Sequence, residues 1–99
     1  MDNMQSLQKA IKLHQAGQLD DAEQWYRKIL KIEPSHPDAN HNLGVLMVHK
    51  SQPDLALTLF RIALESNPSS DLFWASFIDA FIRVGQLDVA ESIFHQDRN

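Results

Sequence analysis

The stretch AGQLDDA at residues 16–22 returns as VGQLDVA at residues 84–90, two steps of 34 residues further along the chain. The same step relates small, aromatic and turn-forming residues elsewhere in the sequence. The matching sets are Ala22, Ala56 and Ala90; Tyr26, Phe60 and Phe94; Gly17, Ser51 and Gly85; and the pair Pro34 and Pro68. A fixed period of this length is typical of stacked supersecondary units, none of which buries its apolar face alone. The sequence therefore predicts a short solenoid.

Six helices and no strand are expected, because apolar residues recur at intervals of three and four and do not alternate. Gly17 and Gly85 are placed to end helices in the left-handed conformation that glycine adopts without a steric penalty. Ser69 or Ser70 is expected to cap the fifth helix. The expected helices cover residues 3–16, 19–32, 37–50, 53–66, 71–84 and 87–97.

Composition limits the possible functions. A net charge of -4 and dispersed basic residues argue against binding to nucleic acid, which requires clustered Lys and Arg. The sequence contains no apolar run of the roughly 18 residues that a membrane helix needs, and residues 1–5 do not resemble a signal peptide. It also contains no cysteine. We expect one cytoplasmic domain that binds neither nucleic acid nor membrane.

The spacing resembles the tetratricopeptide repeat, in which an aromatic and Leu-Gly in one helix precede Ala, an aromatic and a closing Pro in the next. Residues 37–70 match best. Their matching residues are Asn42, Leu43, Gly44, Ala56, Phe60, Ala63 and Pro68. The resemblance implies an all-α solenoid of antiparallel helix pairs, a single domain over residues 1–99. Its repeats, about two and a half in number, would be residues 3–36, 37–70 and the partial repeat 71–99.

The third repeat departs from the family pattern. Ile78 stands where a small residue is expected, so we expect looser or shifted packing between the two helices of this repeat. Trp74 occupies the aromatic position and is expected in the core. Phe73, Phe77 and Phe81 are expected to pack between helices.

The two ends of the array differ in polarity. Gln5, Lys9 and Lys12 occupy the face of the first helix that would contact a preceding repeat, which predicts a solvated edge. The last helix instead carries an apolar stripe, with no polar helix after it to cover the stripe. We therefore expect either that the chain is a fragment of a longer protein or that this face self-associates. The candidate self-association residues are Val89, Ile93 and Phe94.

The resemblance further implies a concave groove, lined by the first helix of each repeat, that binds a protein or peptide partner. Its candidate residues are Leu7, Gln8, Ile11, His14, His41, Asn42, Val45, His49, Ser76, Asp79 and Arg83. Asn42 stands where the family often has an asparagine that bonds a peptide backbone, although an ordinary solvated residue is an equal interpretation. A carboxylate clamp is disfavoured, because its basic positions hold Leu7, Leu72 and Ser76.

No signature of chemistry accompanies this groove. His14, His41 and His49 are able to line one groove, but zinc sites show a denser pattern of ligands. The serines belong to no nucleophile elbow. We expect no catalysis, no cofactor and no metal. Two alternatives to peptide binding stay open. Residues 71–80 resemble repeats found ahead of bacterial glycosyltransferase or sulfotransferase domains, so the chain would be the N-terminal segment of such an enzyme; or the chain is a scaffold that dimerises through its last helix.

Overall fold

The computed structural model describes the backbone of residues 1–97 and the side chains of residues 1–86. Within the described residues it contains five α-helices and no strand, which confirms the all-α solenoid. The helices are α1 (Asn3–Gln15), α2 (Leu19–Ile32), α3 (Pro37–His49), α4 (Pro53–Ser66) and α5 (Asp71–Asp97). None of these helices, as far as they are described, is long and apolar enough to cross a membrane.

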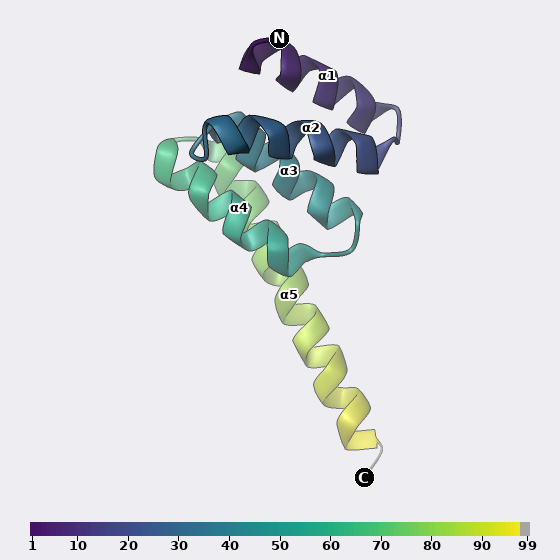
Figure 1. Cartoon of the computed structure of the whole chain (residues 1–99). Coiled ribbons are helices and arrows are strands. Elements are labelled where there is room, and N and C mark those ends of the chain that lie inside the picture. The colour runs from purple at the N-terminus through teal and green to yellow at the C-terminus, as the bar shows by residue number, and fades with distance from the viewer. Residues whose placement is uncertain (98–99) are drawn as a thin grey trace.

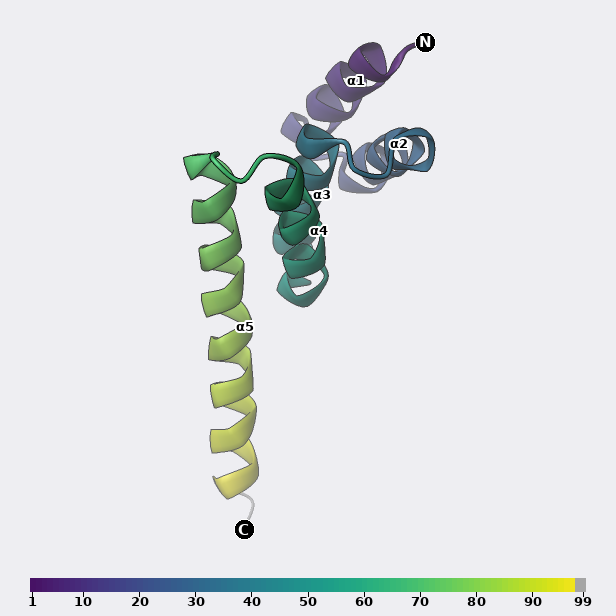
Figure 2. The same ribbon diagram turned by 90° about the vertical axis from the view of Figure 1, so that its left-hand side faces the viewer.

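The helices are arranged as two stacked hairpins followed by one long helix. Helices α1 and α2 form the first hairpin and α3 and α4 the second, and α5 packs on the second hairpin (Figure 1). The first helices of successive repeats also touch, α1 with α3 and α3 with α5. The C-terminal half of α5 runs beyond the hairpins, which gives the molecule an elongated shape of 56 × 30 × 20 Å (Figure 2).

The core lies where the second helix of each hairpin meets the first. Tyr26 and Phe60, one period apart, are completely or almost completely buried. Gly44 explains why the second hairpin closes so tightly: a Cβ atom there would lie 2.6 Å from Cδ1 of Phe60 and closer still to Cε1. Ala10, at the equivalent position of α1, belongs with Tyr26 to the same core cluster. Gly44 facing Phe60 therefore sets how closely the second hairpin closes, and Ala10 and Tyr26 hold the same positions in the core of the first.

The loops are fixed by local hydrogen bonds. Asp2 and Gln5 form a capping box at the start of α1, with the Asp2 carboxylate accepting from the Gln5 amide at 2.8 Å. The side-chain amide of Asn40 donates to the carbonyl oxygens of Pro34 and His36, at 3.0 and 2.9 Å, and so fixes the turn before α3. Ser70 caps α5 by accepting from the Phe73 amide at 3.2 Å.

The expected break at Gly85 does not occur, and that prediction was wrong. Gly17 has φ of +79° and ends the first hairpin's leading helix, whereas Gly85 lies inside the continuous helix α5. The four letters GQLD thus include the turn before α2 at residues 17–20, where Leu19 already begins the helix, but are helical throughout at residues 85–88. The local sequence is the same in both places, so tertiary packing determines whether these residues form a turn or a helix.

Ile78 supplies the physical reason. It stands at the position of Ala10 and Gly44, where the other hairpins need a residue small enough to admit an aromatic ring. A second helix folded back on α5 would bring its aromatic residue against the branched Ile78 side chain. We expected the two helices of the third repeat to pack in a shifted arrangement. Along the described part of α5 they do not form a hairpin, and α5 continues straight.

The straight helix also corrects the expected core. Phe73 is buried and Phe77 is half-buried against the second hairpin, as expected. Trp74 and Phe81 were expected to be buried too, but they are exposed because no second helix covers them. The side chains of Val89, Ile93 and Phe94 lie outside the described residues.

The contrast between two glycines provides a first test. Gly44→Ala should lower the free energy of unfolding by about 1–3 kcal/mol, because the methyl group overpacks against the Phe60 ring. Gly85→Ala should raise it by about 0.5–1 kcal/mol, because nothing lies within 4 Å of its Cβ position and alanine favours helix. Urea unfolding followed by circular dichroism measures both. A destabilising Gly85→Ala would mean that residue 85 forms a turn.

Backbone conformation at Ser51 provides a second test. Ser51 has φ of 61°, the left-handed conformation that Gly17 adopts one repeat earlier. Ser51→Gly should raise the free energy of unfolding by up to about 1 kcal/mol, because the steric cost of this conformation exceeds the entropy that glycine adds to the unfolded chain. Ser35→Gly is the control, since Ser35 has negative φ and should gain nothing. Equal effects in both variants would contradict the explanation.

Candidate functional site

Two neighbouring hollows lie on the face formed by the first helices. The first, of about 400 Å³, is lined by Ile11, His14, Gln15, Tyr26, Asn42 and His49. The second, of about 340 Å³, is lined by Val45, Val48, His49, Phe60, Ala75, Ser76, Asp79 and Arg83. His49 belongs to both. Together the hollows form the groove, a mixed apolar and polar surface that crosses all three first helices.

Two histidines meet across the first hollow. The Nε2 atom of His14 lies 3.0 Å from Nδ1 of His49, and Nδ1 of His14 lies 3.3 Å from the Tyr26 hydroxyl. This hydrogen bond needs one ring nitrogen as donor and the other as acceptor. It therefore cannot form when both imidazole rings are protonated. Burial, with repulsion from His49 as a smaller cause, lowers the pKa of His14. Burial also raises the pKa of Tyr26 to about 12, so its hydroxyl stays protonated at neutral pH.

A second polar chain joins α3 to α5 beneath the groove. The Ser76 hydroxyl lies 2.8 Å from Nε2 of His41, and Nδ1 of His41 lies 3.3 Å from Oδ1 of Asn42. One tautomer satisfies both contacts, with the hydroxyl donating to Nε2 and Nδ1–H donating to Asn42. This arrangement occupies the oxygen of Asn42 and leaves its Nδ2 hydrogens as donors for a partner.

His41 is correspondingly positioned as a buried residue. Its ring lies between Phe60 and Phe73, with centroid distances of 5.4 and 4.7 Å, and it is 6% exposed. Burial lowers its pKa, and this effect outweighs the opposing influence of Asn42 and Asp38. The sequence placed His41 on the groove surface, but the structure places it below that surface, where it orients Asn42.

The charges in the second hollow balance one another. Arg83 donates through Nε to Oδ2 of Asp79 at 2.7 Å, one helical turn away, and both side chains are more than half exposed. Such a pair contributes little to stability, about 0–1 kcal/mol. It does reduce the net field in the groove. Burial lowers the pKa of His14, so this ring adds little charge to the groove at neutral pH.

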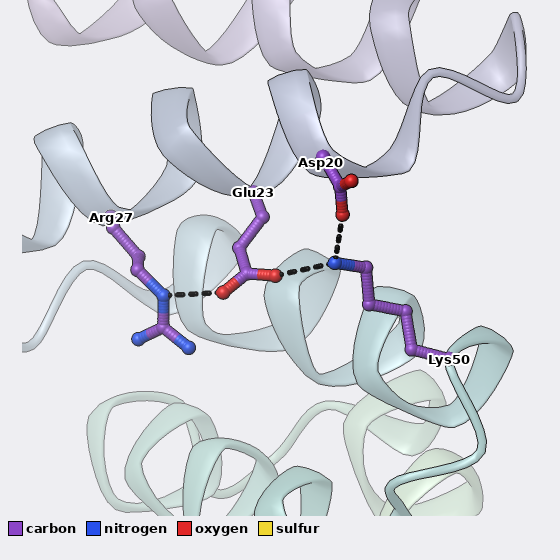
Figure 3. A network of polar contacts seen from close by, with 4 residues as sticks. All are labelled: Asp20, Glu23, Arg27 and Lys50. Carbon is purple, nitrogen blue, oxygen red and sulfur yellow. Dashed lines mark hydrogen bonds and ion pairs between the residues drawn. The ribbon is translucent and has the colours of Figure 1, made fainter.

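An ion-pair network lies outside the groove and joins the two hairpins (Figure 3). The ammonium group of Lys50, at the end of α3, contacts Asp20 and lies 2.9 Å from Glu23, both on α2. Arg27 donates to the other oxygen of Glu23 at 2.8 Å. Hydrogen bonds to Lys50 lower the pKa of both carboxyls, and the same contacts raise the pKa of Lys50. The network orients α2 against α3. Its side chains, Asp20 and Arg27 above all, are exposed to solvent, as is usual for a structural ion pair.

Most of the predicted groove residues come together. Eight of them line the two hollows: Ile11, His14, Asn42, Val45, His49, Ser76, Asp79 and Arg83. Leu7 and Gln8 lie on α1 outside both hollows. Whether any of these residues contacts a partner stays a prediction.

Sequence reasoning missed Tyr26 and Phe60, which come from the second helices yet line the floor of the groove. The signal was present in the sequence. Because Ala10 and Gly44 are so small, an aromatic ring from the second helix can extend between residues of the first. The same small residues that close the hairpins therefore bring these buried rings beneath the groove.

The chemistry available to these residues is hydrogen bonding. The Ser76–His41 contact has the distance of a nucleophile and its base, but His41 is buried and Ser76 lies inside α5, where backbone amides bond within the helix. Such a site lacks the backbone donors that stabilise an oxyanion. Among the described residues, no three His, Cys, Asp or Glu side chains are placed to hold a metal ion.

The lowered pKa values predict that acid destabilises the fold. Between the folded pKa of His14 or His41 and the unfolded value of about 6.5, the unfolded chain binds more protons. Stability is therefore complete above about pH 6.5 and falls below it, by at most about 1.4 kcal/mol per pH unit for each histidine. Urea unfolding at pH 7.5 to 5 measures this slope, which His14→Gln should reduce. The pKa values of Asp20 and Glu23 are also lowered, so their contribution to stability is lost only below this pH range. A free energy of unfolding that does not change between pH 7.5 and 5 would contradict the lowered histidine pKa values.

Comparison with known proteins agrees with this architecture. The family described as tetratricopeptide repeat matches residues 13–75, which cover most of the two complete hairpins. The chain is also similar to tetratricopeptide repeat protein 21A of Mus musculus, with 32% identity over 78 residues. That alignment covers 79% of this chain and 6% of the relative, so the chain spans a small part of that protein's length. The 34-residue period, the paired helices and the small residue facing an aromatic ring thus have one explanation: this chain belongs to the tetratricopeptide repeat family.

Proposed function

We propose that this chain is a non-catalytic protein–protein interaction module that binds an extended partner segment in the groove formed by α1, α3 and α5. Members of its family generally bind protein partners. The observation that carries the proposal is the pair of adjoining hollows, which offer one set of contacts per repeat. An extended chain fits this repetition better than a compact ligand, because its side chains recur at a regular spacing.

The polar groups suit recognition of a peptide backbone. The Nδ2 hydrogens of Asn42 are available to a carbonyl oxygen, since its own oxygen is occupied by His41. His49 lies between the two hollows, where its ring can bond a second backbone group. The apolar walls, contributed by Ile11, Val45 and Val48, favour small apolar side chains on the partner.

Charge favours a largely neutral partner segment. Asp79 and Arg83 compensate each other, and the pKa of His14 is lowered, so neither sign of charge dominates the groove. A strongly acidic or basic segment would lose hydration there without gaining a partner of opposite charge. A segment that precedes a larger bacterial enzyme would use the same groove in the same way, so one experiment addresses both interpretations.

A peptide library displayed on phage and selected against the whole chain provides the probe. Selected peptides should bind Asn42→Ala at least about tenfold more weakly, because a hydrogen bond to the peptide backbone contributes about 1 kcal/mol and its loss leaves a buried carbonyl unsatisfied. Ala75→Phe should weaken binding too, by filling the second hollow without touching the Asn42 contacts. Isothermal titration calorimetry measures all affinities.

Gln24→Ala is the matched control, since it removes an exposed amide from the outer helix α2. It should leave the affinity unchanged. If the selected peptides bind Asn42→Ala, Ala75→Phe and Gln24→Ala equally well, the groove is not the binding site.

A further inference from the structure

The polar groups of the first hollow form a chain of hydrogen bonds that begins at a buried hydroxyl. Tyr26, on α2, is completely buried, and its hydroxyl lies 3.3 Å from Nδ1 of His14. The Nε2 atom of His14 lies in turn 3.0 Å from Nδ1 of His49. Within the described residues, neither the Tyr26 hydroxyl nor Nε2 of His49 makes another hydrogen bond. The chain therefore runs from the core of the first hairpin to an exposed ring on α3.

The buried end fixes the direction of each hydrogen bond in this chain. A neutral His14 with its proton on Nδ1 would donate to the Tyr26 oxygen and leave the hydroxyl hydrogen buried without an acceptor, which is costly. The hydroxyl therefore donates to Nδ1 of His14, and the proton of this ring is on Nε2. That N–H donates to Nδ1 of His49, so a neutral His49 carries its own proton on Nε2. His49 consequently presents a donor to the groove.

A second chain with the same direction ends at Asn42. The Ser76 hydroxyl donates to His41, and His41 donates to Oδ1 of Asn42, which leaves the Nδ2 hydrogens of Asn42 for a partner. The other polar groups that line the first hollow are used within the two chains, apart from Gln15, which is exposed at the end of α1. The two groups of the hollow whose hydrogen bonding is fixed, Asn42 and His49, are thus both donors.

The spacing of these donors favours one conformation of the partner. Asn42 and His49 are seven residues apart on α3, which places them on one face of the helix and about 10.5 Å apart along its axis. In a polyproline II helix, carbonyl groups three residues apart point the same way at about 9.3 Å. In a β-strand, carbonyl groups on one side recur at about 6.6 Å. The polyproline II spacing is the closer match, and two side chains can adjust to the small difference.

We propose that the partner is a proline-rich segment in the polyproline II conformation, an inference that rests on the peptide binding proposed above. Proline has a carbonyl group but no N–H, so such a segment brings acceptors to a hollow whose fixed groups donate. Its uncharged apolar rings suit the wall formed by Ile11. A polyproline II helix has no internal hydrogen bonds, so its carbonyl groups stay available, and its stiffness reduces the entropy lost on binding.

Nitrogen-15 NMR of the whole chain at pH 8, where imidazole is neutral, tests the chain of hydrogen bonds without a ligand. His49 should be the Nε2–H tautomer. Tyr26→Phe removes only the hydroxyl, so His14 becomes able to carry its proton on either nitrogen, and His49 should then show both tautomers. His36 is the internal control: its Nδ1 accepts from the Ala39 amide, so its tautomer should be the same in both proteins.

Peptides selected from a phage library against the whole chain test the partner class, and they should be enriched in proline. N-methylation of their remaining backbone N–H groups, one at a time, should change the dissociation constant less than about threefold, because the hollow offers these groups no fixed acceptor. His49→Phe keeps an aromatic ring without a donor and should raise the dissociation constant about fivefold, the loss of one hydrogen bond. Gln24→Ala, on the outer helix α2, should have no effect. Isothermal titration calorimetry measures these values.

Three results would overturn this inference and leave the groove as the binding site. His49 as the Nδ1–H tautomer removes the donor. Selected peptides that are rich in acidic residues, or not enriched in proline, show that the hollow takes another ligand. A tenfold loss of affinity on N-methylation at alternate positions shows a β-strand that uses its N–H groups. Equal binding by Asn42→Ala, Ala75→Phe and Gln24→Ala instead removes the proposed function, and this inference with it.

Discussion

The fold depends on the contact between an aromatic ring and a residue almost without a side chain. Gly44 lets the Phe60 ring approach so closely that a single added carbon would collide with it, and Ala10 shares a core cluster with Tyr26 in the same relation. This contact sets how closely two helices of a hairpin approach, and interiors packed at this density respond to one methyl group. Where Ile78 replaces the small residue, no hairpin forms along the described chain.

The groove follows from the same contact. Because the rings of Tyr26 and Phe60 reach between residues of the first helices, each hollow has an aromatic floor as well as walls from neighbouring repeats. The hydroxyl of Tyr26 then bonds His14, which bonds His49 one repeat later. A contact that serves hairpin packing thus determines which polar groups surround the proposed peptide site.

The sequence predicted what repeats and missed what depends on geometry across helices. The period of 34 residues, with Ala22 and Ala56 both fully buried, was sufficient for the fold class and for four helices within about one residue of their observed ends. It failed at Gly85 because the same Gly-Gln pair forms the turn between two helices at residues 17–18 and lies inside helix α5 at residues 85–86, so tertiary packing decides the outcome. The exposure of Trp74 follows from that failure.

His41 was misplaced for another reason. A helical pattern predicts which face of the helix a residue lies on, whereas its burial depends on Phe60 and Phe73 from two other helices.

Polar contacts between repeats bear on the binding that we propose. His14 with His49, His41 with Ser76, and Lys50 with Glu23 each join residues of neighbouring repeats. Individually such contacts contribute little to stability, about 1 kcal/mol, but each has a directional geometry that fixes how one repeat sits on the next. A fixed stacking angle holds the two hollows at a constant separation. An extended segment that enters the groove loses its own conformational freedom, but the protein is already ordered. The entropic cost of binding is therefore smaller, which allows a small interface to bind with measurable affinity. The same polar contacts also limit what can bind, because a ligand that competes for His49 or Asn42 must replace the hydrogen bonds they already make.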